Sequence, residues 1–499
     1  MMFCLIFTNI YETKFAFMFN LFILLLNKII LINKNTMKTL TATKKLVVLF
    51  LATMFVLSCS DDDNDPIPFV PTDSIVEIAQ DTPQLTSLVD ALTKYPDLVS
   101  TLSGDGTFTV FAPTNDAFDA LLTAIGQDDI DDIPESVLRN VLEFHVHASA
   151  AITSGQVSPG TLPMVNGESA TITSDSNGLY VEGAQIVAVD ALATNGVVHL
   201  IDGVMVPPSI APIVGTIVAP AYFNKDFTTL IAAVENANAD ILSVLLGNGP
   251  SGNGLTLFAP TNAAFEAAGV TDVNGADAVL TYHVIDATVR AADLPTTAGS
   301  ATPVTTIGGD VYLTNSGSGV ALNGTTNVVL TDIEGSNGVV HVIDRVLLPP
   351  TQTINEIVAE FAGGNPGEFT LLATALQRAG LGDTFGTAGP FTVFAPTDAA
   401  FLAAGLDADA INSTDPTAVA GILTHHVVKA SAYVFSSDLV DGDVEMLNNQ
   451  NVGINVSALT VQDAAGSNPP AGLVPSLLNV HATNGVVHVI DKVLLPAAQ

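Results

Sequence analysis

The 499-residue sequence predicts a protein of the α+β class built from three tandem domains. Two blocks of sequence each occur three times, in the same order. The first reads Phe-Thr-Val-Phe-Ala-Pro-Thr from Phe108, and close copies begin at Leu255 and Phe391. The second reads Asn-Gly-Val-Val-His-Leu-Ile-Asp from Asn195 and also recurs twice. Successive copies are separated by well over a hundred residues, so each copy is expected to mark a whole domain rather than one unit of a solenoid.

The first block predicts a short strand followed directly by a helix. Residues 108–112 alternate apolar side chains with threonine, and the strand is expected to end at Pro113, which cannot donate to a ladder. Thr114 stands where a helix N-cap belongs. Asn115 and Asp116 then fall in the first turn, next to the positive end of the helix dipole.

The second block predicts a tight turn followed by a buried strand. Asn195 and Gly196 form a strong turn signal, because both residue types tolerate positive φ. Residues 197–201 are apolar on both faces apart from His199, which shares a face with Val197 and Ile201. A strand with two apolar faces is expected at the centre of a sheet.

Helical patterns complete each unit. Residues 75–102 carry leucines at helical spacing, and so do the apolar residues between Ile133 and Leu142. Strands and helices within one unit give the α+β class. Domains are predicted over residues 74–208, 212–350 and 353–497. The proline pairs at 207–208 and 349–350 predict short, stiff joints and a monomeric rod.

The N-terminal region reads as an export signal. Residues 37–58 combine lysines with an apolar stretch of 12 residues, Leu46 to Leu57, which is too short to span a membrane. The following Cys59 completes a pattern that resembles a bacterial lipobox, so its thiol is expected to carry lipid. The alternative is a plain secretory signal in which this cysteine is incidental.

The segments on either side of this signal are predicted to be an upstream extension and a tether. Residues 1–36 precede a complete signal, which favours Met37 as the true start; a membrane helix near residues 15–32 is the competing interpretation. Residues 59–73 form an acidic, proline-rich tether that resembles an outer-surface export tag. Its alternative is a solvated linker. The expected location is the outer membrane, facing the cell exterior.

Charge and cysteine content exclude several functions. The formal net charge is −36, from 14 basic and 50 acidic residues. Such a surface repels phosphate backbones, so a nucleic-acid partner is not expected, whereas cationic partners and divalent cations are permitted. The two cysteines, Cys4 and Cys59, provide no disulfide framework and no thiolate site in the folded part. Neither a cofactor nor a resident metal is predicted.

The two repeated blocks, FTVFAPTNDAF and NGVVHLIDGVMVP, resemble the signatures of the fasciclin (FAS1, or beta-Ig-H3) domain. The resemblance covers residue 74 to the C-terminus and implies a twisted β-wedge flanked by helices. It further implies cell adhesion or matrix association, with a Tyr-His motif as the contact region. The positions that match this motif are Tyr282-His283, Phe144-His145 and His425-His426, of which the first matches best. The binding residues implied are therefore Tyr282, His283, Phe144, His145 and His426.

The repeated histidines could instead be core residues with satisfied hydrogen bonds, which is the simpler interpretation of a residue present in all three copies. His145 and His147 would share one strand face if extended, as in a two-histidine metal clamp, but the other copies lack the second histidine. The stretch 247–252 matches G-x-G-x-x-G but follows a helical run, so it predicts a loop and no phosphate site.

A non-enzymatic, lipid-anchored surface protein that binds protein or glycan ligands is the function that these features favour. The alternatives are a structural envelope or biofilm-matrix scaffold without a specific receptor, and a glycan-binding module.

Overall fold

The computed structural model describes residues 70–270, 272–294, 301–315, 319–364, 367–467 and 469–497. The predicted signal peptide, Cys59, most of the acidic tether and the upstream extension lie outside the described residues. Residues 71–499 form one unit of the structure. Among the described residues, no helix is long and apolar enough to cross a membrane.

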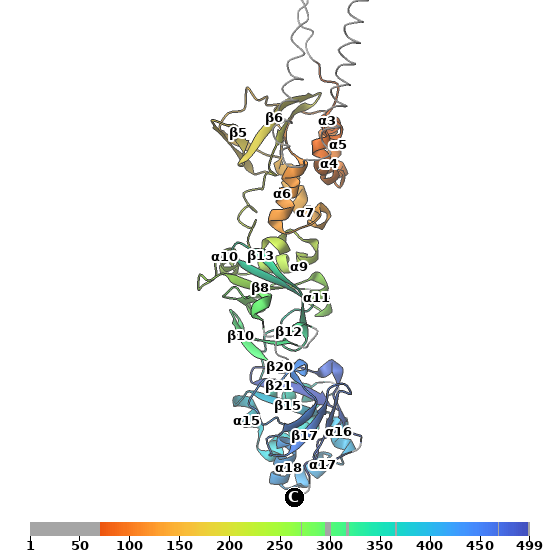
Figure 1. The fold of residues 1–499 in the computed structure, drawn as a ribbon. Helices are drawn as coiled ribbons and strands as arrows, with labels where there is room; N and C mark the ends of the chain where they lie inside the picture. Colours follow the sequence, from red (N-terminus) through yellow and green to blue (C-terminus); the bar gives the residue numbers. More distant parts are fainter. Residues whose placement is uncertain are drawn as a thin grey trace, which may run out of the picture. The chain divides into compact units, whose positions relative to one another are not determined.

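The first domain pairs a helical layer with a seven-stranded sheet. Figure 1 shows α3, α4 and α5 together on one side and β5 and β6 on the other. Its helices are α3 (Ile75–Asp81), η1 (Pro83–Leu85), α4 (Thr86–Thr93), α5 (Pro96–Ser103), α6 (Asn115–Ile125), η2 (Ile130–Asp132) and α7 (Glu135–Phe144). Its strands are β1 (Phe108–Pro113), β2 (Val146–His147), β3 (Gly160–Pro163), β4 (Ser169–Asp175), β5 (Gly178–Val181), β6 (Ala184–Ala193) and β7 (Gly196–Ile201). The strand order is β2-β1-β7-β6-β5-β4-β3.

The second domain repeats this plan with its strands closed into a barrel. Its helices are α8 (Ala219–Tyr222), η3 (Lys225–Phe227), α9 (Thr228–Glu235), α10 (Ala239–Leu246), α11 (Asn262–Ala267), α12 (Asp277–Tyr282) and η4 (Ala291–Asp293). Its strands are β8 (Leu255–Pro260), β9 (Val284–Ile285), β10 (Thr302–Thr306), β11 (Gly309–Asn315), β12 (Val320–Leu322), β13 (Thr326–Gly335) and β14 (Gly338–Ile343). The strand order around the barrel is β10-β11-β12-β13-β14-β8-β9.

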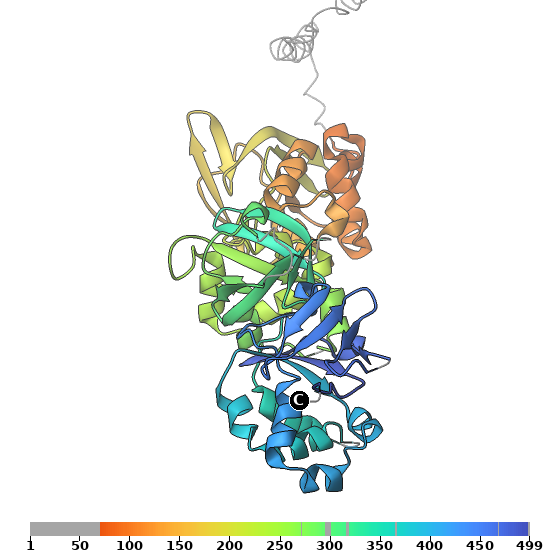
Figure 2. The ribbon, with the colours of Figure 1, turned by 60° about the horizontal axis from the view of Figure 1, so that its bottom comes forward.

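The third domain separates its helices from its strands, as the cyan helices and blue strands of Figure 2 show. Its helices are α13 (Ile354–Ala362), α14 (Thr370–Ala379), α15 (Gly382–Thr387), α16 (Asp398–Ala403), α17 (Ala408–Ser413), α18 (Pro416–Thr424), η5 (Ser436–Asp438) and η6 (Pro475–Leu477). Its strands are β15 (Phe391–Pro396), β16 (Gly442–Glu445), β17 (Asn451–Asn455), β18 (Thr460–Gln462), β19 (Ala471–Gly472), β20 (Val480–Ala482) and β21 (Gly485–Ile490). They form the sheets β15-β21-β20 and β16-β17-β18-β19. The α+β class and the three tandem domains are confirmed.

Both repeated blocks form the predicted elements. The first block gives β1, β8 and β15, each fully or almost fully buried and each ending at its proline. The hydroxyl of Thr114 then accepts the backbone N–H of Ala117, so the predicted N-cap is confirmed, and Thr261 and Thr397 cap α11 and α16 in the same way. The second block gives β7, β14 and β21, and β7 lies between β1 and β6 as a central strand.

The predicted opening helix over residues 75–102 is interrupted. The structure has three short α-helices and the 3-10 helix η1 there, with breaks before Pro83 and Pro96. Proline disfavours helical geometry in the residue before it, and its own nitrogen has no hydrogen to donate, so each proline begins a new helix instead of continuing the last one.

The first and last strands of every domain pair in parallel with one register. Phe111 lies opposite His199, Phe258 opposite His341 and Phe394 opposite His488. Each domain has one apolar cluster between this pair and the helices and a second between the pair and the remaining strands. The parallel pair therefore separates two cores in each domain.

The glycine of the second block is required by close approach to the neighbouring strand. A Cβ on Gly196 would lie 2.2 Å from the carbonyl oxygen of Phe108, and one on Gly485 would lie 2.1 Å from that of Phe391. Asn195 does not adopt the positive φ that a tight turn was expected to need. Its amide instead binds backbone atoms far along the chain: it accepts from Ile75 N at 3.0 Å and donates to Leu102 O at 2.7 Å.

Replacing Gly485 by alanine tests the close approach of β21 to β15. We expect Gly485→Ala to lower the free energy of unfolding by about 2–4 kcal/mol, because the new methyl group collides with backbone that cannot move without breaking the parallel pair. Gly421→Ala is the matched control: this glycine lies inside α18, and a Cβ there would meet no atom within 4 Å outside its own helix. There we expect a stabilisation of about 0.5–1 kcal/mol. Urea unfolding followed by circular dichroism measures both, and equal effects of the two substitutions would contradict the packing argument.

Candidate functional site

The histidine of the expected Tyr-His motif ends a helix in every domain. His145 and His283 are the C-cap residues of α7 and α12, and His426 comes one residue after the C-cap of α18. Each ring Nδ1 lies 2.7–2.9 Å from the carbonyl oxygen four residues earlier in the chain. This distance is a hydrogen bond to the last turn of the helix.

The other ring nitrogen of these histidines binds the chain segment that follows the last strand. Nε2 of His145 accepts the backbone N–H of Met205 at 2.9 Å, and Nε2 of His283 accepts that of Leu347 at 3.0 Å. Nε2 of His426 accepts the N–H of Leu494 at 2.9 Å. Because Nε2 accepts, the proton lies on Nδ1, which donates to the helix. Each ring therefore ties a helix end to the segment that closes its domain.

Burial keeps these three rings neutral. His145, His283 and His426 are at most 2% exposed, and burial lowers the pKa of each to about 4. A hydrogen bond to the helix carbonyl opposes this effect only in part. With both nitrogens bonded to backbone and no charge at neutral pH, the rings are arranged as structural ties.

The second repeated histidine holds a loop that we call the strap. His199 Nε2 lies 2.8 Å from the carbonyl oxygen of Ile152, and Nδ1 accepts the N–H of Asp190 at 3.3 Å. His341 and His488 make the same two contacts within their own domains. The straps are residues 150–154, 287–291 and 432–436.

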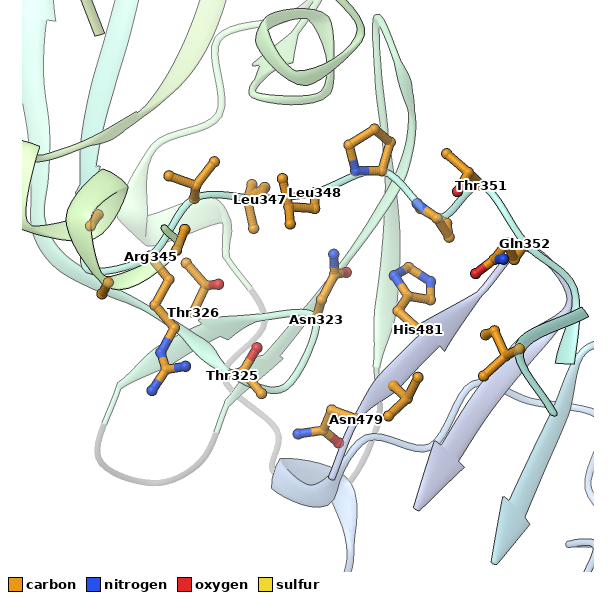
Figure 3. Close-up of a pocket in the computed structure, with 18 of the residues that line it drawn as sticks. Asn323, Thr325, Thr326, Arg345, Leu347, Leu348, Thr351, Gln352, Asn479 and His481 are labelled. Atoms are coloured by element: carbon orange, nitrogen blue, oxygen red, sulfur yellow. The ribbon is translucent and has the colours of Figure 1, made fainter. Parts of the chain in front are cut away.

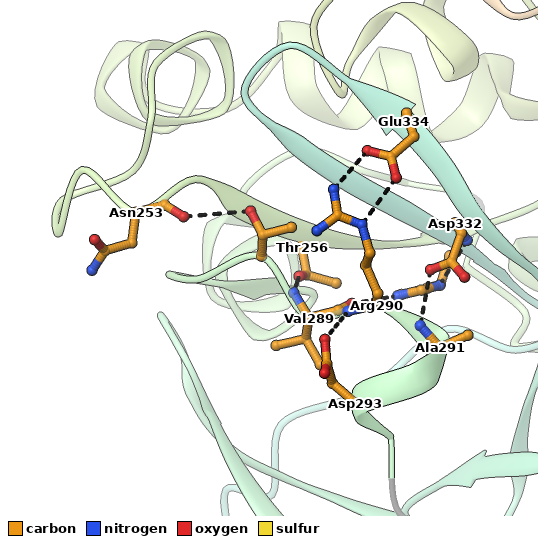
Figure 4. Close-up of polar contacts among 10 residues, drawn as sticks. Asn253, Thr256, Val289, Arg290, Ala291, Asp293, Asp332 and Glu334 are labelled. Carbon is orange, nitrogen blue, oxygen red and sulfur yellow. Dashed lines mark hydrogen bonds and ion pairs between the residues drawn. The ribbon is translucent and has the colours of Figure 1, made fainter.

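A threonine on the first strand also holds each strap. Thr256 donates to the carbonyl oxygen of Ala287 at 2.7 Å and accepts the N–H of Val289 at 2.8 Å. Figure 4 shows this threonine together with Ala291, whose N–H donates to the Asp332 carboxylate at 2.9 Å. Thr109 and Thr392 make the corresponding contacts in the other domains.

The aromatic positions of the expected motif lie in the core. Tyr282 is 1% exposed; its hydroxyl donates to Asp310 O at 2.8 Å and accepts from Asn323 Nδ2 at 3.2 Å. Phe144 is fully buried. His425, which occupies the matching position of the third domain, is also fully buried and bonds Asn448. The side chains predicted as contacts therefore lie inside the domains. Their role in binding stays a prediction, and such a role would require them to position exposed neighbours.

The expected strand face shared by His145 and His147 does not form. His145 has φ −89° and ψ −2°, a helical conformation, because it caps α7. Its Nδ1 bonds the carbonyl oxygen of Val141 in the last turn of that helix. The strand begins only at Val146, and Nδ1 of His147 bonds the carbonyl oxygen of Pro163. Within the described residues, no group of three or more His, Cys, Asp or Glu side chains is placed to hold a metal ion.

The positions beside the straps differ between domains in residue type and in burial, although the backbone contacts are the same: Arg290 is exposed, whereas Phe435 is fully buried. Two of these positions lie on the strap, directly before and directly after the residue whose carbonyl oxygen bonds the repeated histidine. The third lies on the neighbouring antiparallel strand, opposite the first valine of the second block. The three positions hold Ala151, Thr153 and Leu192 in the first domain, Thr288, Arg290 and Glu334 in the second, and Tyr433, Phe435 and His481 in the third.

These positions carry a different chemistry in each domain. In the second domain Arg290 forms a two-point ion pair with Glu334, at 3.0 and 3.1 Å (Figure 4). In the third domain the corresponding aromatic side chains pack on Tyr312 of the second domain, whose ring centre lies 4.3 Å from that of Tyr433. The sequence analysis missed this surface; aligning the three copies on the strap-binding threonine would have located it.

Comparison with known proteins gives a consistent result. The fasciclin domain model matches residues 83–207, 225–349 and 367–496. Transforming growth factor-beta-induced protein ig-h3 from Sus scrofa is 29% identical over 405 residues, covering 80% of this chain and 54% of that protein. Human periostin is 28% identical over 408 residues, covering 79% of this chain and 44% of that protein. The chain thus spans about half the length of these relatives.

A cyanobacterial protein and a solved structure also match. Protein sll1483 from Synechocystis is 39% identical over 137 residues, covering 27% of this chain and 74% of that protein. A FAS1 domain pair from the insect cell adhesion molecule fasciclin I aligns with 54% of this chain and 96% of the pair, at 19% identity and a TM-score of 0.26.

The buried histidines predict how stability depends on pH. Their pKa is about 4 in the folded chain, against an ordinary value of 6.5, so between these values the unfolded chain binds more protons. Stability is therefore complete above about pH 6.5 and falls as the pH is lowered towards 4. We expect His283→Gln to cost about 1–3 kcal/mol at pH 7.5 and to reduce the slope of this fall. Urea unfolding at several pH values between 7.5 and 4.5 measures both, and an unchanged slope would show that His283 does not titrate in this way.

Proposed function

The chain belongs to the fasciclin domain family, and on that premise we propose that it is a non-enzymatic surface protein that mediates adhesion by binding matrix polymers or neighbouring proteins. The fasciclin resemblance of its repeats implied this function. The observation that supports it best is the threefold repetition of an inert scaffold, whose strap side chains differ from one domain to the next.

The histidines that would be the candidates for acid–base chemistry are committed to the backbone. Both nitrogens of His283 and of His341 have backbone partners, and the His283 ring is neutral at physiological pH. A general base needs a free nitrogen within reach of a substrate proton. These residues therefore support a binding function better than a catalytic one.

The strap positions support a binding function because binding specificity depends on the chemistry of side chains. The straps carry small residues in the first domain, an ion pair in the second and aromatic residues in the third. Loops on a rigid framework are the usual place for recognition, since their side chains can change without loss of the fold. The third strap is already used within the chain, where it contacts Tyr312.

The anchor that we propose is the lipid on Cys59, with the outer membrane as the destination. Its support is the sequence alone: a basic segment, 12 apolar residues and a lipobox-like ending, followed by an acidic tether. Two or more acyl chains give stable membrane attachment.

Attachment of cells tests the adhesive function. We expect deletion of the gene to reduce attachment to surfaces and to neighbouring cells, and Cys59→Ala to release the protein and reproduce the loss. Attachment that is unchanged in the deletion strain would favour an envelope or biofilm-matrix scaffold instead.

Incorporation of a labelled fatty acid tests the anchor separately. We expect label in the wild-type protein and none in Cys59→Ala, because only the lipobox cysteine is a substrate for acylation. Proteolysis of intact cells then shows the exposed face of the membrane. Label retained in Cys59→Ala would rule out this residue as the anchor.

A further inference from the structure

A cavity of about 470 Å³ lies where the second domain meets the third (Figure 3). One wall is the linker, residues 345–352, which follows β14 and leads to α13. The turn between β12 and β13 and the strand β20 provide the others, and α11 and α13 contribute to its edges. Its size is within the range of sites that hold small ligands, about 300–1,000 Å³.

Side-chain contacts between the two domains hold this cavity together. The Tyr312 ring lies 4.3 Å from that of Tyr433 and 5.6 Å from that of Phe435, measured between ring centres. The hydroxyls of Thr314 and Ser437 lie 2.8 Å apart, and Asn479 Nδ2 donates to the carbonyl oxygen of Gly324 at 3.1 Å. The cavity walls are therefore fixed by aromatic packing and by hydrogen bonds from both domains.

Arg345, at one end of the cavity, is a cation without a partner in the described part of the chain. Residues 70–497 contain eight lysines and arginines, since six of the 14 precede residue 46. Seven of them bond a carboxylate or a carbonyl oxygen: Lys94, Arg139, Lys225, Arg290, Arg378, Lys429 and Lys492. Arg345 forms no ion pair or hydrogen bond with any described residue, and it is exposed. In a chain with a net charge of −36, an unpaired guanidinium at a cavity indicates an anionic ligand.

His481 lines the same cavity, and neither of its ring nitrogens bonds a described residue. Its Nδ1 is buried and has no hydrogen-bond partner among the described residues. The ring packs edge-on against Tyr312, Tyr433 and Phe435, and burial lowers its pKa to about 4. The second ring nitrogen, Nε2, is not among the buried atoms, so it is the one that can exchange a hydrogen bond with a ligand hydroxyl. Figure 3 shows its ring directed towards the space between the linker and Asn323.

Neutral and apolar groups complete the lining. Thr325 and Thr351 expose hydroxyls that bond no described residue. At the end opposite Arg345, Gln352 donates to Glu360, so that the one carboxylate among the described lining residues is already engaged and lies away from the cation. Leu348 and Phe361 are large apolar side chains that remain 55% and 38% exposed. The cavity thus combines one cation, several hydroxyl-bonding groups and an apolar rim.

We propose that this cavity binds a short acidic saccharide, with one carboxylate on Arg345 and ring hydroxyls on His481, Thr325 and Thr351. The sugar's C–H face would lie on the apolar rim. A uronic acid unit fits this pattern because it pairs one negative charge with several neutral hydroxyls. A polyphosphate fits less well, since it places several charges on adjacent phosphates beside one arginine, whereas each uronic acid unit of a saccharide carries a single charge among neutral hydroxyls. The assignment rests on the proposed matrix-binding function and names the chemistry of one ligand.

Titration calorimetry with the full chain and digalacturonate tests the site. We expect saturable binding at one site, and binding at least tenfold weaker in Arg345→Gln. Lys492→Gln removes the same charge away from the cavity and should bind like the wild type. The dimethyl ester of the same disaccharide should bind at least tenfold more weakly than the acid. Equal binding of acid and ester, or an unchanged affinity in Arg345→Gln, would overturn the assignment of the carboxylate.

A second variant separates ligand contact from folding. His481→Phe keeps an aromatic ring beside Tyr312 but removes the free nitrogen, so we expect binding to weaken several-fold while urea unfolding is unchanged. No binding by the wild type at millimolar digalacturonate would overturn the proposal. The two proposals can fail separately. If attachment depends on the protein but no saccharide binds, only the cavity assignment is rejected. If the saccharide binds but deletion of the gene leaves attachment unchanged, only the adhesive function is rejected.

Discussion

Every domain of this chain depends on the parallel pairing of its first and last long strands. Parallel neighbours cannot be joined by a hairpin, so nearly the whole domain has to fold between them as one long crossover. The pair is unusually close at its start, where a Cβ on Gly196 would lie 2.2 Å from Phe108 O. At the same point Asn195 bonds the start of α3 and the end of α5. The dipeptide Asn195-Gly196 thereby fixes the position of the parallel strand pair and of the helices that pack on it.

The two histidines of each domain extend this arrangement outward. One, such as His283, joins the end of a helix to the segment after the last strand, and the other, such as His341, joins the last strand to the strap. Both act on backbone atoms, so the positions beside the strap remain free to differ. Arg290 in the second domain and Phe435 in the third follow the same strap residue, yet the first is charged and exposed and the second is apolar and fully buried. The scaffold is constant because its bonds use the backbone, and the strap side chains can differ because they take no part in those bonds.

The sequence is informative wherever the physical cause is local. The buried strands, the cap at Thr114 and the class of fold follow from alternation, capping chemistry and repetition. The role of Asn195 could not be predicted, because its partners are about 90 and 120 residues away. In addition, an Asn-Gly sequence is already explained by a tight turn. His145 could share a strand face only if its segment was extended, whereas the structure makes it the C-cap of α7 and lets its ring bond the helix at Val141 O and the closing segment at Met205 N. Arg345 gave no signal at all, since its lack of a partner is visible only when every other cation has been placed.

The third copy shows how a site can arise from repetition. Where the second domain has an ion pair that is satisfied within the domain, the third has aromatic residues that need an apolar partner, and Tyr312 of the preceding domain provides it. Packing two domains through these side chains leaves the linker spanning the space between them, with Arg345 at one end and His481 on the facing strand. Neither domain contains this cavity alone. A ligand held there would contact both domains and would bind only the joined form, so it would stabilise the junction by the free energy of its own binding.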